Sequence, residues 1–280
     1  MSGTSQAGGT VQAAGTVQAR GTVQGPGTKP GPGTTRICDS FGRQAHRYNQ
    51  QAQLQRAIAW RLARQCAHLN LPTGPSADLG AGTGLVGQAL QQLAPQIALE
   101  QVDGCPQLLA RNPLASRNPA TRRHWDLEQG LPAGLHGAAL LTSSFTLQWL
   151  NQPERHLTQW AQALAPGGWL VLAVPTKGCF PQWHGAAQRA QVPCTALPLP
   201  RSTDLLSAAA GPLRLLHGRE HRFSRTYGDG PSFLRQIRQL GAGVSPNPPL
   251  SPGQWRALLR QWPASGIVSW QVLVLVGQKR

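Results

Sequence analysis

The chain has 280 residues, 40% of them hydrophobic, which allows one sizeable folded domain; its longest apolar runs are strand-sized, which excludes a membrane span and a hydrophobic signal segment. Its five cysteines are odd in number and lack Cys-x-x-Cys spacing, so they indicate reduced thiols in a cytoplasmic protein and predict neither a disulfide framework nor a metal site. The 26 basic residues, 23 of them arginine, face only 10 acidic ones, and the formal charge of +16 indicates either a polyanionic partner or a mere shortage of carboxylates.

The amino-terminal segment is dominated by short repeats. The sequence GTVQ begins at Gly9, Gly15 and Gly21, and Gly-Pro pairs follow it. Because such a composition cannot bury a core, residues 1–38 are predicted to be a disordered low-complexity tail. An organelle transit peptide is the alternative, since the segment lacks acidic residues. The folded domain is expected to cover residues 39–280.

Helical patterns follow this tail. Asp39 or Ser40 can cap a first helix, and apolar residues recur at spacings of three to four from Phe41 to Ala52. A second helical pattern covers residues 54–69. These residues are therefore expected to form two helices ahead of the first strand.

Strand and helix patterns then alternate as far as Pro175. In chain order we expect a strand at 77–79, a helix from 84, a strand at 97–102, a helix from 106, strands at 121–125 and 138–143, a helix after 153, a turn at 166–168 and a strand at 169–174. This order predicts an α/β fold with a doubly wound, mostly parallel sheet. Its ligand is expected at the carboxyl ends of the strands.

The rest of the chain has a mixed pattern. Helices are expected at 180–191, from 203, at 232–240 and at 252–262, and strands at 213–223 and 269–276. We interpret residues 178–212, approximately, as a helical lid or substrate insertion. The last two strands are expected to complete the same sheet.

A glycine-rich loop follows the first strand, with Gly80, Ala81, Gly82 and Gly84 after Asp78. Glycines at such a junction let the backbone approach a ligand closely, and the spacing also satisfies the dinucleotide pattern. Asp78 favours S-adenosylmethionine, because a carboxylate there would repel a pyrophosphate but attract an ammonium group.

Further polar residues end the next strands. Asp103, beside Gly104, can accept hydrogen bonds from both ribose hydroxyls, or it can cap the following helix. Asp126 can receive the adenine amino group while Leu127 packs on the ring, or it can form a turn. Ser144 and Phe145 are expected to line the same cleft.

Several segments together resemble the malonyl-acyl-carrier-protein O-methyltransferases of biotin biosynthesis, a family of class I methyltransferases. They are the glycine loop, residues 41–55, FTLQW at 145–149, LAPGG at 164–168, and 234–242, which ends in Leu-Gly-Ala. The resemblance covers residues 39–280 and implies a Rossmann-like sheet of seven strands. The sequence departs from the family mainly in the substrate half, at 182, 192–200 and 243–250.

The resemblance implies that S-adenosylmethionine is the cofactor and that the methyl acceptor is the free carboxylate of malonyl-acyl carrier protein. A carboxylate is ionised near neutral pH, so no general base is needed and no catalytic side chain is predicted. Arg43, Arg47 and Arg238 are the candidates to hold the carboxylate, with solvated surface arginines as the alternative. Trp149 is expected to wall the acceptor pocket unless it is a core residue.

An acidic carrier protein would also account for the basic charge. Arginines alternating with histidines are the candidate docking surface: Arg214, His217, Arg219, His221, Arg222 and Arg225. A monomer is expected, with neither nucleic acid nor a membrane as partner. Three alternatives stay open: a methyltransferase acting on a quinone precursor or another carboxylic acid, an RNA-binding methyltransferase-like protein, and a protein that binds the cofactor only as a regulator.

Overall fold

The structure is a computed structural model that describes residues 32–118 and 121–280. The GTVQ repeats lie outside the described residues. The five cysteines are free thiols, and three of them, Cys66, Cys105 and Cys179, are buried. Among the described residues, no helix combines the length and apolar character that a membrane crossing requires.

Seven strands of the described chain form one sheet. They are β1 (Ser76–Leu79), β2 (Glu100–Asp103), β3 (Arg122–His124), β4 (Ala138–Ser144), β5 (Leu164–Pro175), β6 (Leu213–Thr226) and β7 (Ile267–Lys279). Their order is β3-β2-β1-β4-β5-β7-β6. The first five are parallel, and β7 runs antiparallel between β5 and β6. The predicted doubly wound, mostly parallel α/β sheet is confirmed.

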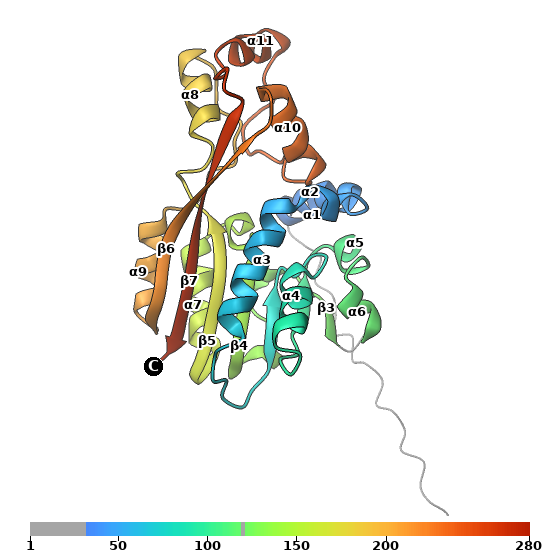
Figure 1. Cartoon of the computed structure of the whole chain (residues 1–280), viewed down its shortest axis with the longest axis vertical. Coiled ribbons are helices and arrows are strands. Elements are labelled where there is room, and N and C mark those ends of the chain that lie inside the picture. The colour runs from blue at the N-terminus through green and yellow to red at the C-terminus, as the bar shows by residue number, and fades with distance from the viewer. Residues whose placement is uncertain (1–31, 119–120) are drawn as a thin grey trace, which may run out of the picture.

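Helices cover both faces of this sheet (Figure 1). They are α1 (Pro32–Gln44), α2 (Tyr48–Gln51), α3 (Gln53–Cys66), α4 (Leu85–Leu93), α5 (Pro106–Leu109), α6 (Pro113–Arg117), α7 (Pro153–Ala163), α8 (Pro181–Arg189), α9 (Ser202–Ala210), α10 (Gly230–Gln239) and α11 (Pro252–Arg260). Helices α3 and α4 share one core with alternate residues of β4, β5 and β7. Helices α7 and α9 share the other core with the intervening residues of the same strands.

Two boundaries differ from the sequence prediction at the amino-terminal side. Helix α1 begins at Pro32, so residues 32–38 are helical and not part of a tail, and Asp39 and Ser40 lie inside the helix instead of capping it. Its buried side packs Cys38 and Phe41, together with Ala45 just after the helix, against Cys105 and Leu108 next to β2. This tertiary contact supplies the apolar partner that local composition did not reveal. Strand β2 begins at Glu100, later than predicted.

The predicted insertion at 178–212 is wrong in its extent. Helix α9 packs against α7 and β6 and covers the sheet. Helices α8, α10 and α11, which we call the lid, lie together where β6 ends and β7 begins (Figure 1). An aromatic cluster joins them: the ring of Phe180 lies 4.5 Å from Trp270 and 5.3 Å from Phe233. Residue periodicity identifies helices but does not show which helices pack together. It therefore could not distinguish one inserted segment from a lid formed by two separate segments.

Candidate functional site

A cavity lies at the carboxyl ends of β1, β2 and β4, where the sheet topology predicts a ligand. Ten of the eleven residues predicted for the cofactor line it: Asp78, Gly80, Ala81, Gly82, Asp103, Gly104, Asp126, Leu127, Ser144 and Phe145. We call it the cofactor cavity. Loops that are far apart in sequence meet here because parallel strands present their carboxyl ends at one edge.

Asp103 organises the glycine loop. Its Oδ2 accepts a hydrogen bond of 2.7 Å from the amide of Gly82, and its Oδ1 accepts one of 2.7 Å from the amide of Cys105. Burial raises the pKa of the Asp103 carboxyl above its ordinary value, and these two backbone donors oppose that effect. Each carboxylate oxygen keeps a further lone pair, so the residue can also accept from two ligand hydroxyls.

Asp78 lies at the end of β1 with only 2% of its surface exposed. The hydroxyl of Thr142 donates a 2.8 Å hydrogen bond to its Oδ1. Burial raises the pKa of Asp78 to about 7, with Asp103 contributing in the same direction. Since burial disfavours a lone carboxylate, a cationic ligand group beside Asp78 would stabilise its ionised form.

Asp126 forms the turn that its sequence position allowed and is also part of the cavity wall. It lines the cofactor cavity, and its side chain also accepts a 3.1 Å hydrogen bond from the amide of Glu128 at the start of the short 3-10 helix η2 (Leu127–Gln129). Ser144, at the end of β4, has a buried hydroxyl without a hydrogen-bond partner among the described residues. Both residues present polar atoms at the cavity wall.

Gly84 is absent from the wall of the cofactor cavity, contrary to the sequence prediction. It precedes α4 with φ of 80°, and a Cβ atom there would lie 2.4 Å from Oδ1 of Asn112. The residue must be glycine because of this left-handed backbone and the close approach of Asn112. Gly84 therefore allows the glycine loop, at the start of α4, to pack against Asn112.

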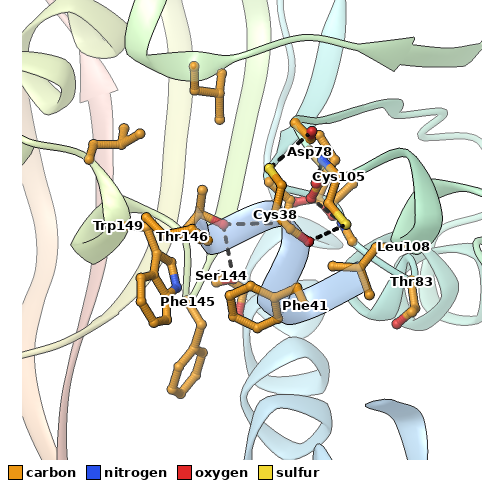
Figure 2. Close-up of a pocket in the computed structure, with 18 of the residues that line it drawn as sticks. Cys38, Phe41, Asp78, Thr83, Cys105, Leu108, Ser144, Phe145, Thr146 and Trp149 are labelled. Carbon is orange, nitrogen blue, oxygen red and sulfur yellow. Dashed lines mark hydrogen bonds between the residues drawn. The ribbon is translucent and has the colours of Figure 1, made fainter. Parts of the chain in front are cut away.

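Helix α1 closes the cofactor cavity and supplies residues that were not predicted for it. Thr34, Ile37, Cys38 and Phe41 line the wall. Figure 2 shows Phe41 near Trp149 and Phe145, and the Phe41 and Trp149 rings meet edge to face at 5.3 Å. Low-complexity composition up to residue 33 hid the start of this helix from sequence reasoning.

The two thiols of this cavity are not reactive nucleophiles. Cys38 Sγ contacts the carbonyl oxygen of Gly104 at 3.2 Å, and Cys105 Sγ contacts that of Cys38 at 3.5 Å. Burial raises the pKa of Cys38 to about 12 and that of Cys105 to about 11. Both therefore stay protonated near neutral pH and serve as apolar packing.

A second cavity, here called the acceptor cavity, adjoins the first. Five residues line both: Phe41, Tyr48, Gln55, Phe145 and Trp149. Its other walls come mainly from α8, α10, the loops that follow these two helices and β7, and they include Phe180, Trp183, Ile237 and Trp270. Among the described residues, neither cavity has a lysine or arginine in its wall. The acceptor cavity is thus an aromatic chamber with neutral polar groups.

Two aromatic residues of this chamber have strained backbones. Phe145 has φ of 56° and Phe180 has φ of 57°, a left-handed conformation that bulky side chains rarely adopt. The amide of Phe145 donates to Ala173 and that of Phe180 to Ser269, at 3.0 and 2.8 Å. These hydrogen bonds to the sheet hold both rings toward the cavity at a cost of about 1–3 kcal/mol each.

The predicted substrate residues separate into three groups. Trp149 lines both the cofactor and acceptor cavities, as expected. Arg43 and Arg238 line a third cavity outside the acceptor cavity, and Arg47 is exposed and lines none of these three. None of the three arginines therefore lines the acceptor cavity, and all three are exposed, on α1, on α10 and in the turn before α2.

The arginines of the predicted docking surface do not share one face of β6. Arg219 and Arg225 pair in register with β7 residues of the core beneath α3. Arg222 has the opposite parity and donates to Ser269 Oγ at 3.2 Å on the other face. Instead, Arg61 of α3 joins the first group by contacting His221 at 3.0 Å. Periodicity alone could not identify this neighbour from α3.

Comparison with known proteins agrees with this geometry. The family profile "Methyltransferase domain" matches residues 48–211, more than half of the chain. A malonyl-[acyl-carrier protein] O-methyltransferase of Alcanivorax borkumensis is 28% identical over 87% of this chain and 86% of its own length. A trans-aconitate 2-methyltransferase of Mycobacterium is 32% identical, but over only 40% of this chain and 42% of its own length.

Solved structures share the fold. The YcgJ protein of Bacillus subtilis superposes with a TM-score of 0.54 at 12% identity, covering 80% of this chain and 99% of its own. A Bacillus halodurans protein, BH2331, gives a TM-score of 0.55 at 12% identity and covers 79% of this chain and 98% of its own. At such low identity the likeness concerns architecture alone.

Proposed function

The chain belongs to the methyltransferase domain family, and we propose that it transfers a methyl group from S-adenosylmethionine to the free carboxylate of a malonyl group on acyl carrier protein. We propose further that it acts as a monomer in the cytoplasm. The nearly full-length similarity to a malonyl-[acyl-carrier protein] O-methyltransferase supports this reaction. The family model alone supports only methyl transfer.

The cofactor cavity suits S-adenosylmethionine in charge and in hydrogen-bond acceptors. Asp78 offers a buried carboxylate to a cationic group, and Asp103 offers acceptor atoms to hydroxyl groups. When bound, S-adenosylmethionine would supply the methyl group. Its sulfonium would also supply one positive charge, which can balance an acceptor with one carboxylate but not an acceptor with three. Phe145 and Trp149, which line both cavities, would orient the acceptor toward it.

The observation that carries the acceptor assignment is the aromatic wall of the acceptor cavity, which lacks lysine and arginine among the described residues. Apolar walls remove water from an attacking carboxylate and so raise its reactivity, whereas an arginine in contact would stabilise it before reaction. Trans-aconitate carries three carboxylates, and this wall provides no cations to compensate them. A malonyl thioester carries one.

A direct test supplies the purified protein with methyl-labelled S-adenosylmethionine and malonyl-acyl carrier protein. The expected result is a mass increase of the carrier by one methylene unit together with incorporated label. Acetyl-acyl carrier protein, which has no free carboxylate, is the matched control. Transfer to trans-aconitate instead, or no transfer to the malonyl carrier while the cofactor still binds, would contradict the proposal.

The same aromatic wall favours one second candidate, a neutral apolar acceptor such as a quinone precursor. Such an acceptor would need a base to remove its hydroxyl proton. Among the described residues that line the acceptor cavity, Tyr48 is the only one with a titratable side chain. Label transfer to a hydroxylated quinone precursor, without transfer to the malonyl carrier, would favour this reaction.

A further inference from the structure

A third cavity lies next to the acceptor cavity and is called here the outer cavity. The two share five lining residues: Trp183, Thr195, Ile237, Gly243 and Val244. On its other side the outer cavity is lined by Arg36 and Arg43 of α1 and Arg238 of α10. A ligand that leaves the acceptor cavity on this side would therefore pass three guanidinium groups.

The outer cavity has an excess of positive charge. Asp39 is the single carboxylate in its described wall, so three arginines leave a surplus of two charges. None of the three arginines forms an ion pair within the described residues. Arginine binds phosphate oxygens through paired N–H donors, which makes an unpaired group of this kind suited to a phosphate.

The arginines are held at this place by the fold. Arg36 and Arg43 are seven residues apart on α1 and therefore lie on one side of the helix. The guanidinium of Arg238 lies 6.0 Å from the Trp255 ring centre, and a Cβ atom on Gly243 would be only 3.0 Å from the Arg238 Cγ. Gly243 beside the stem and the Trp255 ring beside the guanidinium limit the positions that Arg238 can take.

Two residues in the wall of the acceptor cavity have a buried polar atom without a hydrogen-bond partner among the described residues. Trp183, which is 7% exposed, lines both cavities, and its Nε1 has no hydrogen-bond partner among the described residues. Gln148, which is 8% exposed, donates from Nε2 to the Phe145 carbonyl at 2.7 Å, but its Oε1 is likewise without a partner. Since a buried polar atom without a hydrogen-bond partner is unfavourable, both indicate a ligand with an acceptor and a donor.

We propose that the outer cavity binds the phosphate of a phosphopantetheine arm through Arg43 and Arg238, with Arg36 beside them, while the arm runs past Trp183 into the acceptor cavity. The amide groups of the arm supply the carbonyl that Trp183 can donate to and the N–H that Gln148 can accept. The proposal rests on the proposed function in one respect: the acceptor is a thioester on such an arm.

Direct binding tests the subsite without methyl transfer. Phosphopantetheine and pantetheine, both without a malonyl group, are titrated calorimetrically into protein saturated with S-adenosylhomocysteine. We expect phosphopantetheine to bind roughly tenfold more tightly, and Arg43→Gln with Arg238→Gln to abolish that difference. Arg47→Gln is the matched control, because it removes a nearby exposed arginine outside the cavities.

Each outcome has a defined meaning. Equal affinity for the two compounds, or a preference that survives the double substitution, would overturn the proposal. A preference lost in the double variant but kept in the Arg47 variant supports it, even if the malonyl carrier is not methylated, in which case only the proposed function fails. Coenzyme A and unacylated holo-acyl carrier protein, titrated in the same way, show which source of the arm the subsite prefers.

Discussion

The cofactor and acceptor cavities share five wall residues but are assembled in different ways. The cofactor cavity is built mainly by loops that follow strands of the sheet. Its buried carboxylates accept hydrogen bonds from the Gly82 and Cys105 amides and from the Thr142 hydroxyl. The acceptor cavity collects side chains from α1 to α3, the end of β4, the lid and β7. Apart from the wall that α1 provides, the first is determined by local sequence at the strand ends, whereas the second depends on long-range packing.

The cavities also differ in the charge of the side chains that line them. Carboxylates are concentrated in the cofactor cavity, where Asp78, Asp103, Asp126 and Glu128 line the wall, and arginines are concentrated in the outer cavity. The acceptor cavity between them has no fully charged side chain among its described residues. A cationic cofactor would thus approach the neutral acceptor cavity from the side lined by carboxylates, and an anionic phosphopantetheine arm from the side lined by arginines.

The largest expected effect concerns the local architecture. Asp103→Ala removes the acceptor of two backbone hydrogen bonds, so we expect binding of S-adenosylhomocysteine to weaken at least about 100-fold, corresponding to about 3 kcal/mol. Calorimetric titration measures this, with thermal melting to verify folding. Asp126→Asn is the control and should change the affinity by less than about tenfold. Equal effects of the two substitutions would show that Asp103 does not organise the loop.

The next effect probes the long-range architecture at Gly241, where α10 ends with φ of 78°. A Cβ atom there would lie 2.7 Å from Cα of Phe41, so Gly241→Ala should push α1 away from the lid. We expect roughly a tenfold rise in KM for the acceptor and a smaller change in cofactor affinity.

Gly228→Ala separates backbone strain from this contact. Gly228 has φ of 84°, but a Cβ atom there would meet nothing within 4 Å. Both substitutions cost about 1–2 kcal/mol in backbone conformation, and only Gly241→Ala displaces α1. A similar KM for the two variants would mean that the contact with Phe41 does not shape the acceptor cavity.

The third prediction follows from Asp78, whose pKa burial raises to about 7. A cationic ligand group requires the ionised carboxylate, so cofactor affinity is full above that pKa and falls as the pH drops below it. Between about pH 8 and pH 6 we expect roughly a tenfold loss of affinity. Asp78→Asn should bind more weakly at high pH and lose this dependence, and an unchanged pH profile in that variant would exclude Asp78 as the cause.

The smallest effect concerns the arginines of β6. Neither Arg219 nor Arg225 lines the acceptor cavity or the outer cavity, and Arg225 lines a separate groove. They can therefore only attract an acidic carrier at longer range. We expect Arg219→Glu with Arg225→Glu to raise KM for the carrier-bound acceptor about threefold at low salt, without changing that for a free malonyl thioester. Equal changes for both acceptors would contradict a docking role.

Much of the cofactor half could be predicted from the sequence because its signals are local. The glycines follow β1 directly and Asp103 is the last residue of β2, so each lies at a strand end that the sequence pattern identifies. Strand-helix alternation brings these strand ends to one sheet edge. Gly84 shows the limit of such reasoning. It belongs to the glycine pattern, yet its necessity comes from Asn112 on a different segment.

The sequence by itself determined the sheet, its parallel order and the ligand edge, because residue periodicity and glycine positions act over short distances. Only the tertiary structure decided that α1 begins at Pro32, that the lid combines α8 with α10 and α11, and that Arg43 and Arg238 lie outside the acceptor cavity. These features depend on contacts between segments as much as 200 residues apart, such as Phe41 with Gly241. Local propensity does not record such contacts, since their energy arises only when the chain is packed.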